Sequence, residues 1–237
     1  MKHIASRDNA HFKALRKLCQ SGRERRKTGQ TVLDGMHLIE SYVQHVGTVG
    51  EIVVSESGAQ RREISRFLES GKAGKTISIL SDELYADLAT VETPSGIMAV
   101  AVQPRSARRL NQEIDALLLD GIQDSGNLGS ILRSAAAAGF RQVLLSADCA
   151  QVWSPKTLRA GMGAHFLLDI HESCDLPAFL GSYRGQAVLT ALDATIDLFS
   201  LNLKEPVAWV FGSEGQGVRG SGLLPFERYS RHKNHGA

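Results

Sequence analysis

The protein has 237 residues, of which 43% are hydrophobic and 22% charged, a composition typical of a globular protein with one large or two ordinary domains. Its three cysteines, Cys19, Cys149 and Cys174, are widely spaced and form no CxxC pair, so we expect neither a disulfide framework nor a zinc site. No long uncharged apolar segment is present, and the N-terminus lacks the apolar core of a signal peptide. These features favour a cytoplasmic protein that does not span a membrane.

The net charge of +2 is unevenly distributed along the chain. Residues 1–30 contain nine lysines or arginines against two carboxylates, so the rest of the chain is slightly acidic. A basic arm on an acidic protein suggests a polyanionic partner, because neutralised phosphates supply most of the sequence-independent affinity for nucleic acid. The alternative is a helix face that is charged only to stay solvated. The candidate RNA contacts in the densest basic cluster are Arg23, Arg25, Arg26 and Lys27.

The first hundred residues alternate helices with short strands. Phe12, Leu15 and Leu18 give one apolar helix face, and the charged, glycine-containing stretch after residue 20 interrupts that pattern. Strands are predicted at 31–33, 51–55, 76–80 and 97–102, and further helices at 36–43, 60–69 and 82–88. Residues 1–102 therefore form a small α/β domain. We find in it no carboxylate pair, nucleophile with a nearby histidine, or metal-ligand spacing.

A polar segment, residues 103–115, is predicted to link this domain to a second one at 116–220. Its arginines either contact a phosphate backbone or merely keep the linker solvated. The second domain alternates strands and helices in the manner of a parallel sheet. Strands are expected at 116–119, 141–146, 164–168, 186–191 and 207–211. Ser154 and Pro155 favour the start of a helix at 156–160, and a further helix is expected at 175–183.

The chain is organised around residues 120–139, DGIQDSGNLGSILRSAAAAG, which read as a strand end, a loop and a helix. We expect Asn127 to cap this helix and Leu128, Ile131, Leu132, Ala135 and Gly139 to share one face, with Arg133 on another face that points away from the core. A second glycine-rich loop, residues 212–217, follows a later strand and carries Glu214. Ligands of open α/β sheets bind at the carboxyl ends of strands, so these two loops are the predicted site. The second loop matches neither a P-loop nor a dinucleotide fingerprint.

Three motifs carry a family resemblance. Residues 120–139, then SPKTLRAGMGAHF, then VFGSEGQGV resemble the first two signature motifs of the SpoU/TrmH-like RNA ribose 2′-O-methyltransferases of the SPOUT superfamily. The stretch from Ile4 through TVLDGMHLIES to TPSGIMAVAV is similar to the substrate-binding domain of the ribosomal-RNA branch. The resemblance implies an α/β fold with a trefoil knot, a homodimer, and S-adenosylmethionine-dependent methylation of a ribose 2′-hydroxyl in structured RNA, ribosomal RNA in preference to transfer RNA. It implies no metal.

The resemblance also implies roles for individual residues. Asn127, Arg133 and Glu214 match catalytic positions, and Arg133 also matches an RNA contact. Gly212, Thr190, Glu214 and Gly217 match positions that line the cofactor pocket. A guanidinium has a pKa above about 12, so we interpret Arg133 as an anchor for an RNA phosphate and a stabiliser of alkoxide charge rather than as a base.

The chain departs from the family pattern in three places. Ser125 replaces a usual proline and Gly161 a usual serine, and the ending RGSGLLPFERYSRHKNHGA contains no third motif. We therefore expect residues 221–237 to be an unstructured, atypical tail. The alternative function is a truncated, catalytically impaired RNA-binding relative. A third possibility, a nucleotide-binding α/β enzyme, lacks support because the phosphate-binding fingerprints are missing.

Overall fold

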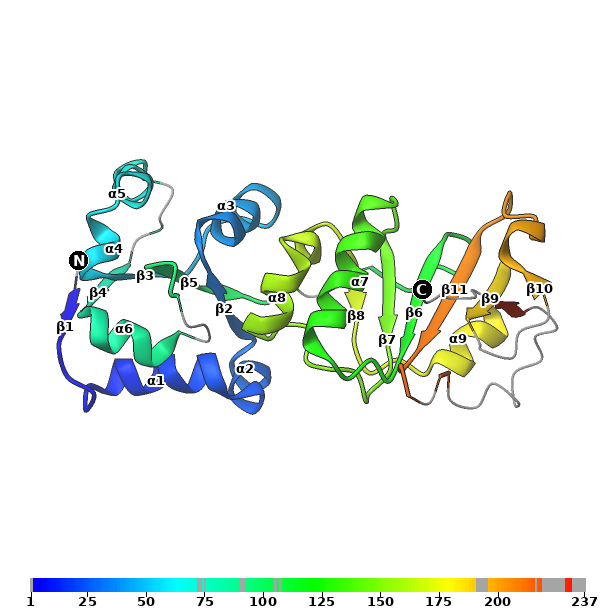
Figure 1. The fold of residues 1–237 in the computed structure, drawn as a ribbon, viewed down its shortest axis with the longest axis horizontal. Helices are drawn as coiled ribbons and strands as arrows, with labels where there is room; N and C mark the ends of the chain where they lie inside the picture. Colours follow the sequence, from blue (N-terminus) through cyan, green and yellow to red (C-terminus); the bar gives the residue numbers. More distant parts are fainter. Residues whose placement is uncertain are drawn as a thin grey trace, which may run out of the picture. The chain divides into compact units, whose positions relative to one another are not determined.

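The contacts of the chain form two units, drawn in Figure 1. The N-terminal unit comprises residues 1–104 and 151–166, and the C-terminal unit comprises residues 105–150 and 167–237. The structure, a computed structural model, describes residues 2–71, 74, 76–89, 93–104, 106, 108–190, 196–215, 217, 218 and 229–231. Among these residues, no helix combines the length and the apolar character needed to cross a bilayer.

A five-stranded mixed sheet forms the centre of the N-terminal unit, in the order β1-β4-β3-β5-β2. Its strands are β1 (Lys2–Ile4), β2 (Gln30–Asp34), β3 (Glu51–Ser55), β4 (Ile77–Leu80) and β5 (Ile97–Val102). Strand β4 pairs in parallel with β1 and β3, whereas β5 runs antiparallel to β2 and β3. The four predicted strands are present. Strand β1 was not predicted, because three residues are too few to show an alternating pattern.

The helices of this unit are α1 (Ala10–Gln20), α2 (Gly22–Thr28), α3 (Met36–His45), α4 (Glu56–Ala59), α5 (Arg62–Glu69) and α6 (Asp82–Leu88). The predicted apolar face of α1 is confirmed, since Phe12, Leu15 and Leu18 are buried in one cluster with residues of β2, β3 and α6. Helix α2 lies where the sequence pattern predicted an interruption. It forms because the Ser21 hydroxyl caps its first turn, and Gly29 ends it in the left-handed conformation at φ 64°.

The C-terminal unit contains a seven-stranded sheet in the order β10-β12-β9-β11-β6-β7-β8. Its strands are β6 (Ala116–Asp120), β7 (Gln142–Leu145), β8 (Asp169–His171), β9 (Gln186–Thr190), β10 (Ile196–Asp197), β11 (Val207–Gly212) and β12 (Tyr229–Arg231). All of these pairings are parallel, which confirms the predicted sheet. Helix α9 (Leu176–Ser182) buries Leu176, Phe179 and Leu180 against one face of β6 and β11. Helix α7 (Ser125–Ala137) buries Leu128, Leu132 and Ala135 of the predicted face, whereas Ile131 is only partly buried and Gly139 lies exposed beyond the helix end.

Two predictions about strand 164–168 and about the tail were wrong. Residues 164–168 do not form a strand: Ala164–Phe166 is a 3-10 turn, and the strand begins only at Asp169. The chain turns sharply before it, at Met162 with φ 49° and Gly163 with φ 87°. The tail is not wholly irregular, since Tyr229–Arg231 forms β12 beside β9. The rest of the tail, and much of the chain that would thread the predicted knot, lie outside the described residues.

The segment 151–166 follows β7 in the sequence but packs within the N-terminal unit. It contains α8 (Pro155–Gly161), capped by Ser154 with Pro155 in the first turn, as predicted. The Thr31 hydroxyl of β2 donates to the Trp153 carbonyl at 2.7 Å, and Arg159 forms an ion pair with Asp34. The two contact-based units therefore differ from the continuous domains predicted at 1–102 and 116–220. Whether the chain folds as those continuous domains stays a prediction.

His165 lies at the centre of this packed segment, with 1% of its surface exposed. Its Nε2 donates to the Val152 carbonyl at 3.0 Å, and within the described part of the chain its Nδ1 has no hydrogen-bond partner. Burial lowers its pKa from 6.5 to about 4, because the charged imidazolium would lose its hydration.

This burial predicts acid sensitivity. The unfolded chain binds the His165 proton below pH 6.5 and the folded chain only below about 4, so the free energy of unfolding should fall across that window. The loss should reach up to about 3 kcal/mol. Urea unfolding between pH 7 and 4 measures it. His165→Gln keeps an N–H donor but cannot titrate, so its pH dependence should be flatter, and an unchanged slope would contradict the assignment.

Candidate functional site

The two predicted loops meet at the carboxyl ends of β6 and β11. These strands are adjacent and parallel, with Asp120 opposite Gly212, so the loops that follow them leave the sheet at the same edge (Figure 1). Together they enclose a pocket of about 500 Å³. It is lined by Gly121, Ile122, Gln123, Asp124, Asn127, Ile131, Phe211, Gly212, Ser213, Glu214 and Gly215.

The first loop ends in a helix cap that differs from the predicted one. Asp124 is the N-cap of α7, and its Oδ1 accepts from the Asn127 amide at 2.8 Å. Asn127 therefore lies in the first turn of the helix, and the prediction that it caps the helix was wrong. Aspartate and asparagine cap equally well, so the sequence alone could not choose between them. The outcome leaves the Asn127 side chain available, and its Nδ2 donates to Glu214 Oε1 in the second loop.

The second loop folds back on itself. Ser213 and Gly217 exchange two backbone hydrogen bonds, of 3.1 and 2.8 Å, and Gly217 has φ 66°. A Cβ on Gly212 would lie 1.9 Å from the carbonyl carbon of Gly217, so this crossing requires glycine at position 212. Glu214 lies at the exposed tip of the turn, where the hydrogen bond to Asn127 ties it to α7.

The structure brings together only part of the predicted set. Asn127, Gly212 and Glu214 line the pocket, while Arg133, Thr190 and Gly217 are not among its lining residues. Arg133 is exposed on α7, and Thr190 ends β9, where its hydroxyl donates to the Val210 carbonyl at 3.3 Å.

Asp124 and Ser213 lie in the two predicted loops but were given no role of their own, and Gln123 and Phe211 were not predicted as pocket residues. Asp124 was open to prediction, because an aspartate three residues before Asn127 is itself a helix-capping signal.

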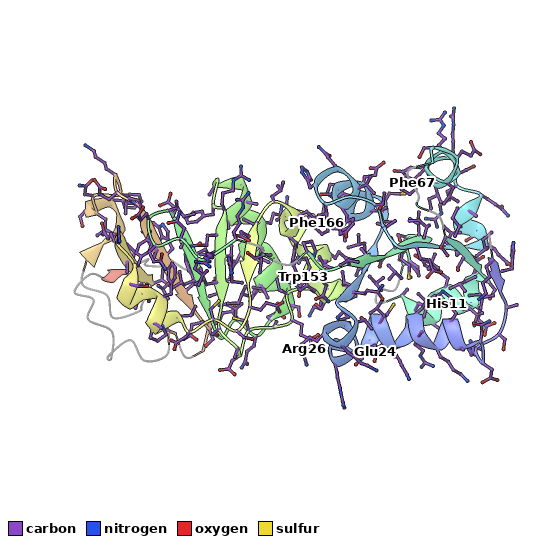
Figure 2. The ribbon with its side chains drawn as sticks, turned by 180° about the vertical axis from the view of Figure 1, so that it is seen from behind. His11, Glu24, Arg26, Phe67, Trp153 and Phe166 are labelled. Carbon is purple, nitrogen blue, oxygen red and sulfur yellow. The ribbon has the colours of Figure 1, made fainter. Side chains whose placement is uncertain are left out.

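The predicted RNA contacts on α2 divide into two kinds. Arg23, Arg26 and Lys27 are exposed, and Figure 2 marks Arg26 on this helix. Arg25 is only 6% exposed, and its guanidinium donates to the carbonyls of Leu18 and Cys19 at 2.9 Å. A phosphate on the surface can reach Arg23, Arg26 and Lys27. It cannot reach Arg25, whose hydrogen bonds instead hold the end of α1.

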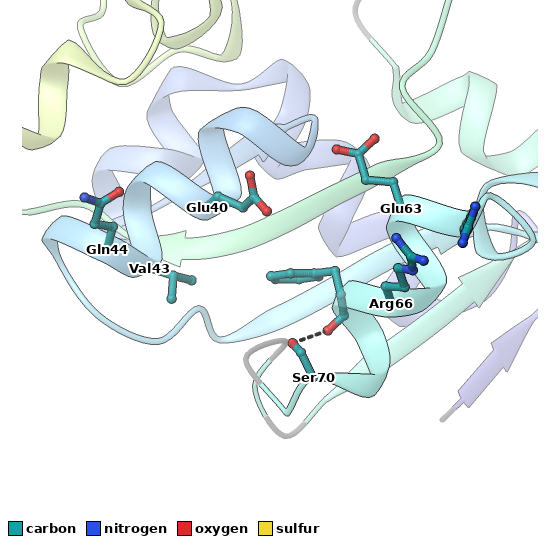
Figure 3. Close-up of a pocket in the computed structure, with 8 residues that line it drawn as sticks. Glu40, Val43, Gln44, Glu63, Arg66 and Ser70 are labelled. Atoms are coloured by element: carbon teal, nitrogen blue, oxygen red, sulfur yellow. Dashed lines mark hydrogen bonds between the residues drawn. The ribbon is translucent and has the colours of Figure 1, made fainter.

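A second hollow, of about 950 Å³, lies between α3 and α5 (Figure 3). Its lining combines Glu40 and Glu63 with Arg62 and Arg66, so its charges nearly cancel. Phe67 belongs to the same lining, and its carbonyl accepts from the Ser70 hydroxyl at 2.6 Å. This hollow contains none of the predicted site residues.

Comparison with known proteins identifies the family. Residues 116–225 match the model of the SpoU rRNA methylase family, and residues 9–99 match the MRM3-like substrate binding domain. The chain is 31% identical over 221 residues to the 23S rRNA (guanosine(2553)-2′-O)-methyltransferase RlmP of Bacillus subtilis, an alignment that covers 92% of this chain and 85% of that protein. This chain belongs to the SpoU rRNA methylase family. The family resemblance predicted from the motifs is thereby confirmed.

Further relatives and solved structures are also similar to this chain. The chain is 35% identical over 153 residues to the human mitochondrial rRNA methyltransferase 3, covering 62% of this chain and 36% of that protein. A crystal structure of an RNA 2′-O ribose methyltransferase matches with a TM-score of 0.83 and 25% identity over 99% of this chain and 91% of the other. An AdoMet-bound rRNA methyltransferase from Sinorhizobium meliloti has the same fold, with a TM-score of 0.81 and 22% identity over 99% of this chain and 90% of the other.

The two family matches do not coincide with the two structural units of this SpoU protein. Residues 151–166 fall inside the methylase match at 116–225. By their contacts they nevertheless belong to the N-terminal unit, which also contains the substrate-binding match at 9–99. The methylase sequence thus contributes one of its segments to the packing of the other unit.

Proposed function

We propose that this SpoU-family protein transfers a methyl group from S-adenosylmethionine to a ribose 2′-hydroxyl of ribosomal RNA, in the pocket at the ends of β6 and β11. The observation that carries the proposal is the hydrogen bond between Asn127 and Glu214, which joins the two family motifs across one pocket. The B. subtilis relative RlmP acts on 23S rRNA, and the N-terminal match to a substrate-binding domain supports an RNA of that class.

The residues of the pocket fit the proposed cofactor. S-adenosylmethionine supplies, when bound, an electrophilic methyl group on a positively charged sulfonium. Asp124 and Glu214 bring carboxylates to the pocket lining, and such groups favour a cation nearby. Gly212 and Gly215 leave backbone without side chains, which permits a ligand to approach closely. Gly217 holds the loop closed behind them, and Thr190 remains a predicted contact from β9.

We assign Arg133 to RNA rather than to the pocket. A residue six positions after Asn127 lies about 120° away around an ideal helix, so the two side chains face different directions. An exposed guanidinium is permanently charged and well suited to a phosphate. Arg133 would then hold the RNA backbone and orient the ribose, while its positive charge stabilises the 2′-oxygen as the hydroxyl proton leaves.

The exposed cations of α2 give a prediction about RNA affinity. Neutralising Arg23, Arg26 and Lys27 together, as glutamines, should weaken RNA binding and lower the slope of log affinity against log salt by about 2 to 3, since each lost phosphate contact removes nearly one counterion. Filter binding at several salt concentrations measures this slope. The matched control neutralises Arg62 and Arg66 on α5, which should leave the slope unchanged. Equal effects from both helices would contradict the assignment to α2.

The proposed reaction is tested with methyl-labelled S-adenosylmethionine and unmodified transcripts of 23S rRNA, 16S rRNA and tRNA. We expect label in 23S rRNA, recovered by mass spectrometry as a 2′-O-methylated nucleoside. Label on a base would overturn the ribose assignment. Binding of RNA without transfer to any transcript would contradict the enzyme and favour the catalytically impaired relative.

We also propose that the protein is a cytoplasmic homodimer. An apolar groove of about 530 Å³ lies beside the pocket and shares Ile131 and Phe211 with it, and Leu117, Ala135 and Trp209 also line it. A second copy of the chain is the expected occupant, because apolar surface of this kind is stabilised by burial. Light scattering should give twice the chain mass of 25.7 kDa. A monomer at micromolar concentration would overturn this proposal.

A further inference from the structure

Gln151 occupies the point at which the chain passes from the C-terminal unit into the N-terminal unit. The preceding residue, Ala150, donates its amide to the Ile122 carbonyl at 2.8 Å, and Ile122 lines the pocket. Gln151 itself accepts at Oε1 from Arg25 Nη2 at 2.6 Å. Two consecutive residues are thus hydrogen-bonded to the pocket loop and to the basic helix α2, respectively.

Three hydrogen bonds of Arg25 make the attachment to α2. The second terminal nitrogen of Arg25, Nη1, donates to Leu18 and Cys19 at the end of α1, so the guanidinium is fixed from both sides. The Gln151 carboxamide also rests against the start of α2, where a Cβ on Gly22 would lie 1.8 Å from its terminal atoms. A change in the position of α2 therefore acts directly on Gln151.

The attachment to the pocket is equally direct. The Gly121 amide, just after β6, donates to the Ser146 hydroxyl at 3.0 Å. The Cys149 thiol donates to the Leu119 carbonyl of β6 at 3.2 Å. Together with the backbone hydrogen bond from Ala150 to Ile122, these bonds attach the segment 146–150 to the end of β6 and to the loop that follows it. Displacing residue 150 would move the pocket wall.

We infer that Gln151 is a positioning residue that couples RNA bound on α2 to the affinity of the methyl-donor pocket. The inference rests on the proposed function, because it requires RNA on Arg23, Arg26 and Lys27 and a cofactor in the pocket. The peptide bond between Ala150 and Gln151 joins the hydrogen bond to the pocket loop and the hydrogen bond to α2 along the chain. By linkage, the factor by which RNA tightens the cofactor equals the factor by which the cofactor tightens RNA.

Equilibrium dialysis of S-adenosylhomocysteine, which carries no transferable methyl group, tests the coupling with and without an unmodified 23S rRNA transcript. In the wild type, RNA should tighten the ligand by about fivefold or more. In Gln151→Ala this ratio should fall to about one, while affinity without RNA stays within about twofold. Gln151→Glu retains an acceptor for Arg25 and should preserve the ratio. The control Thr31→Val removes a different bond to the same segment and should also preserve it.

Three results would overturn the inference: no effect of RNA on the wild-type affinity, an unchanged ratio in Gln151→Ala, or an equal loss in Thr31→Val. The last result would mean that docking of the whole segment, rather than Gln151, carries the coupling. Failure of the proposed function is distinguishable from these. A wild-type protein that binds S-adenosylhomocysteine but transfers no methyl group contradicts the function, yet its coupling ratio is still measurable.

Discussion

Replacing Glu214 with alanine should lower kcat/KM for methyl transfer by about 100-fold, because misplacement of a site by about 1 Å costs a factor of that order. The Glu214 carboxylate accepts from Asn127 Nδ2 and thereby ties the tip of the second loop to α7. Without this bond the tip of the loop loses its attachment to α7, while the Ser213 and Gly217 backbone pair still closes its base. Steady-state kinetics with labelled S-adenosylmethionine and 23S rRNA measure the loss.

Three further variants separate positioning from charge. Glu214→Gln keeps the acceptor and loses the charge, so its activity should lie between those of the wild type and the alanine variant. Asn127→Ala removes the other partner and should cost about as much as Glu214→Ala, with the double variant little worse than either, since one interaction is lost in all three. Glu205→Ala, on an exposed position before β11, is the matched control. Additive losses at Asn127 and Glu214 would show that the two residues act independently.

Replacing Asp34 with alanine should destabilise the protein by about 2 to 3 kcal/mol, a large part of the stability of an ordinary domain. The Asp34 side chain is 7% exposed, whereas that of its partner Arg159 is 34% exposed, so water reduces the cost below that of a fully buried pair. Asp34 also accepts from the Ser95 hydroxyl at 2.7 Å. The midpoint of urea unfolding measures the loss.

The exposed ion pair of Asp8 and Lys13 is the control for the loss of stability expected in Asp34→Ala. Its side chains are 94% and 56% exposed, and the bond measures 2.9 Å. Asp8→Ala should leave the urea midpoint nearly unchanged, because solvent screens such pairs. Asp34→Asn retains an acceptor for Ser95 and should lose less than Asp34→Ala. Equal shifts for the Asp8 and Asp34 variants would contradict a structural role for the buried pair.

The sequence by itself determined the features that depend on local pattern. Several such features are where they were predicted: the apolar faces of α1 and α7, the two glycine-rich loops, and the strands β2 to β7, β9 and β11. These features follow from spacings of two to four residues, which a helix or a strand converts directly into a face. The family motifs identified the two loops as parts of one site, and the pocket between them is lined by Asn127, Gly212 and Glu214.

Only the tertiary structure decided which of several equivalent residues takes each role. Asp124 rather than Asn127 caps α7, and this choice leaves the Asn127 amide for Glu214, 87 residues further along the chain. Arg25 is indistinguishable in sequence from Arg26, yet it is buried against Gln151. Residues 164–168 read as a strand, but Ala164–Phe166 is a 3-10 turn that belongs to the N-terminal unit. The hydrogen bonds from Asn127 to Glu214 and from Arg25 to Gln151 join residues far apart in the sequence, and no local period encodes such contacts.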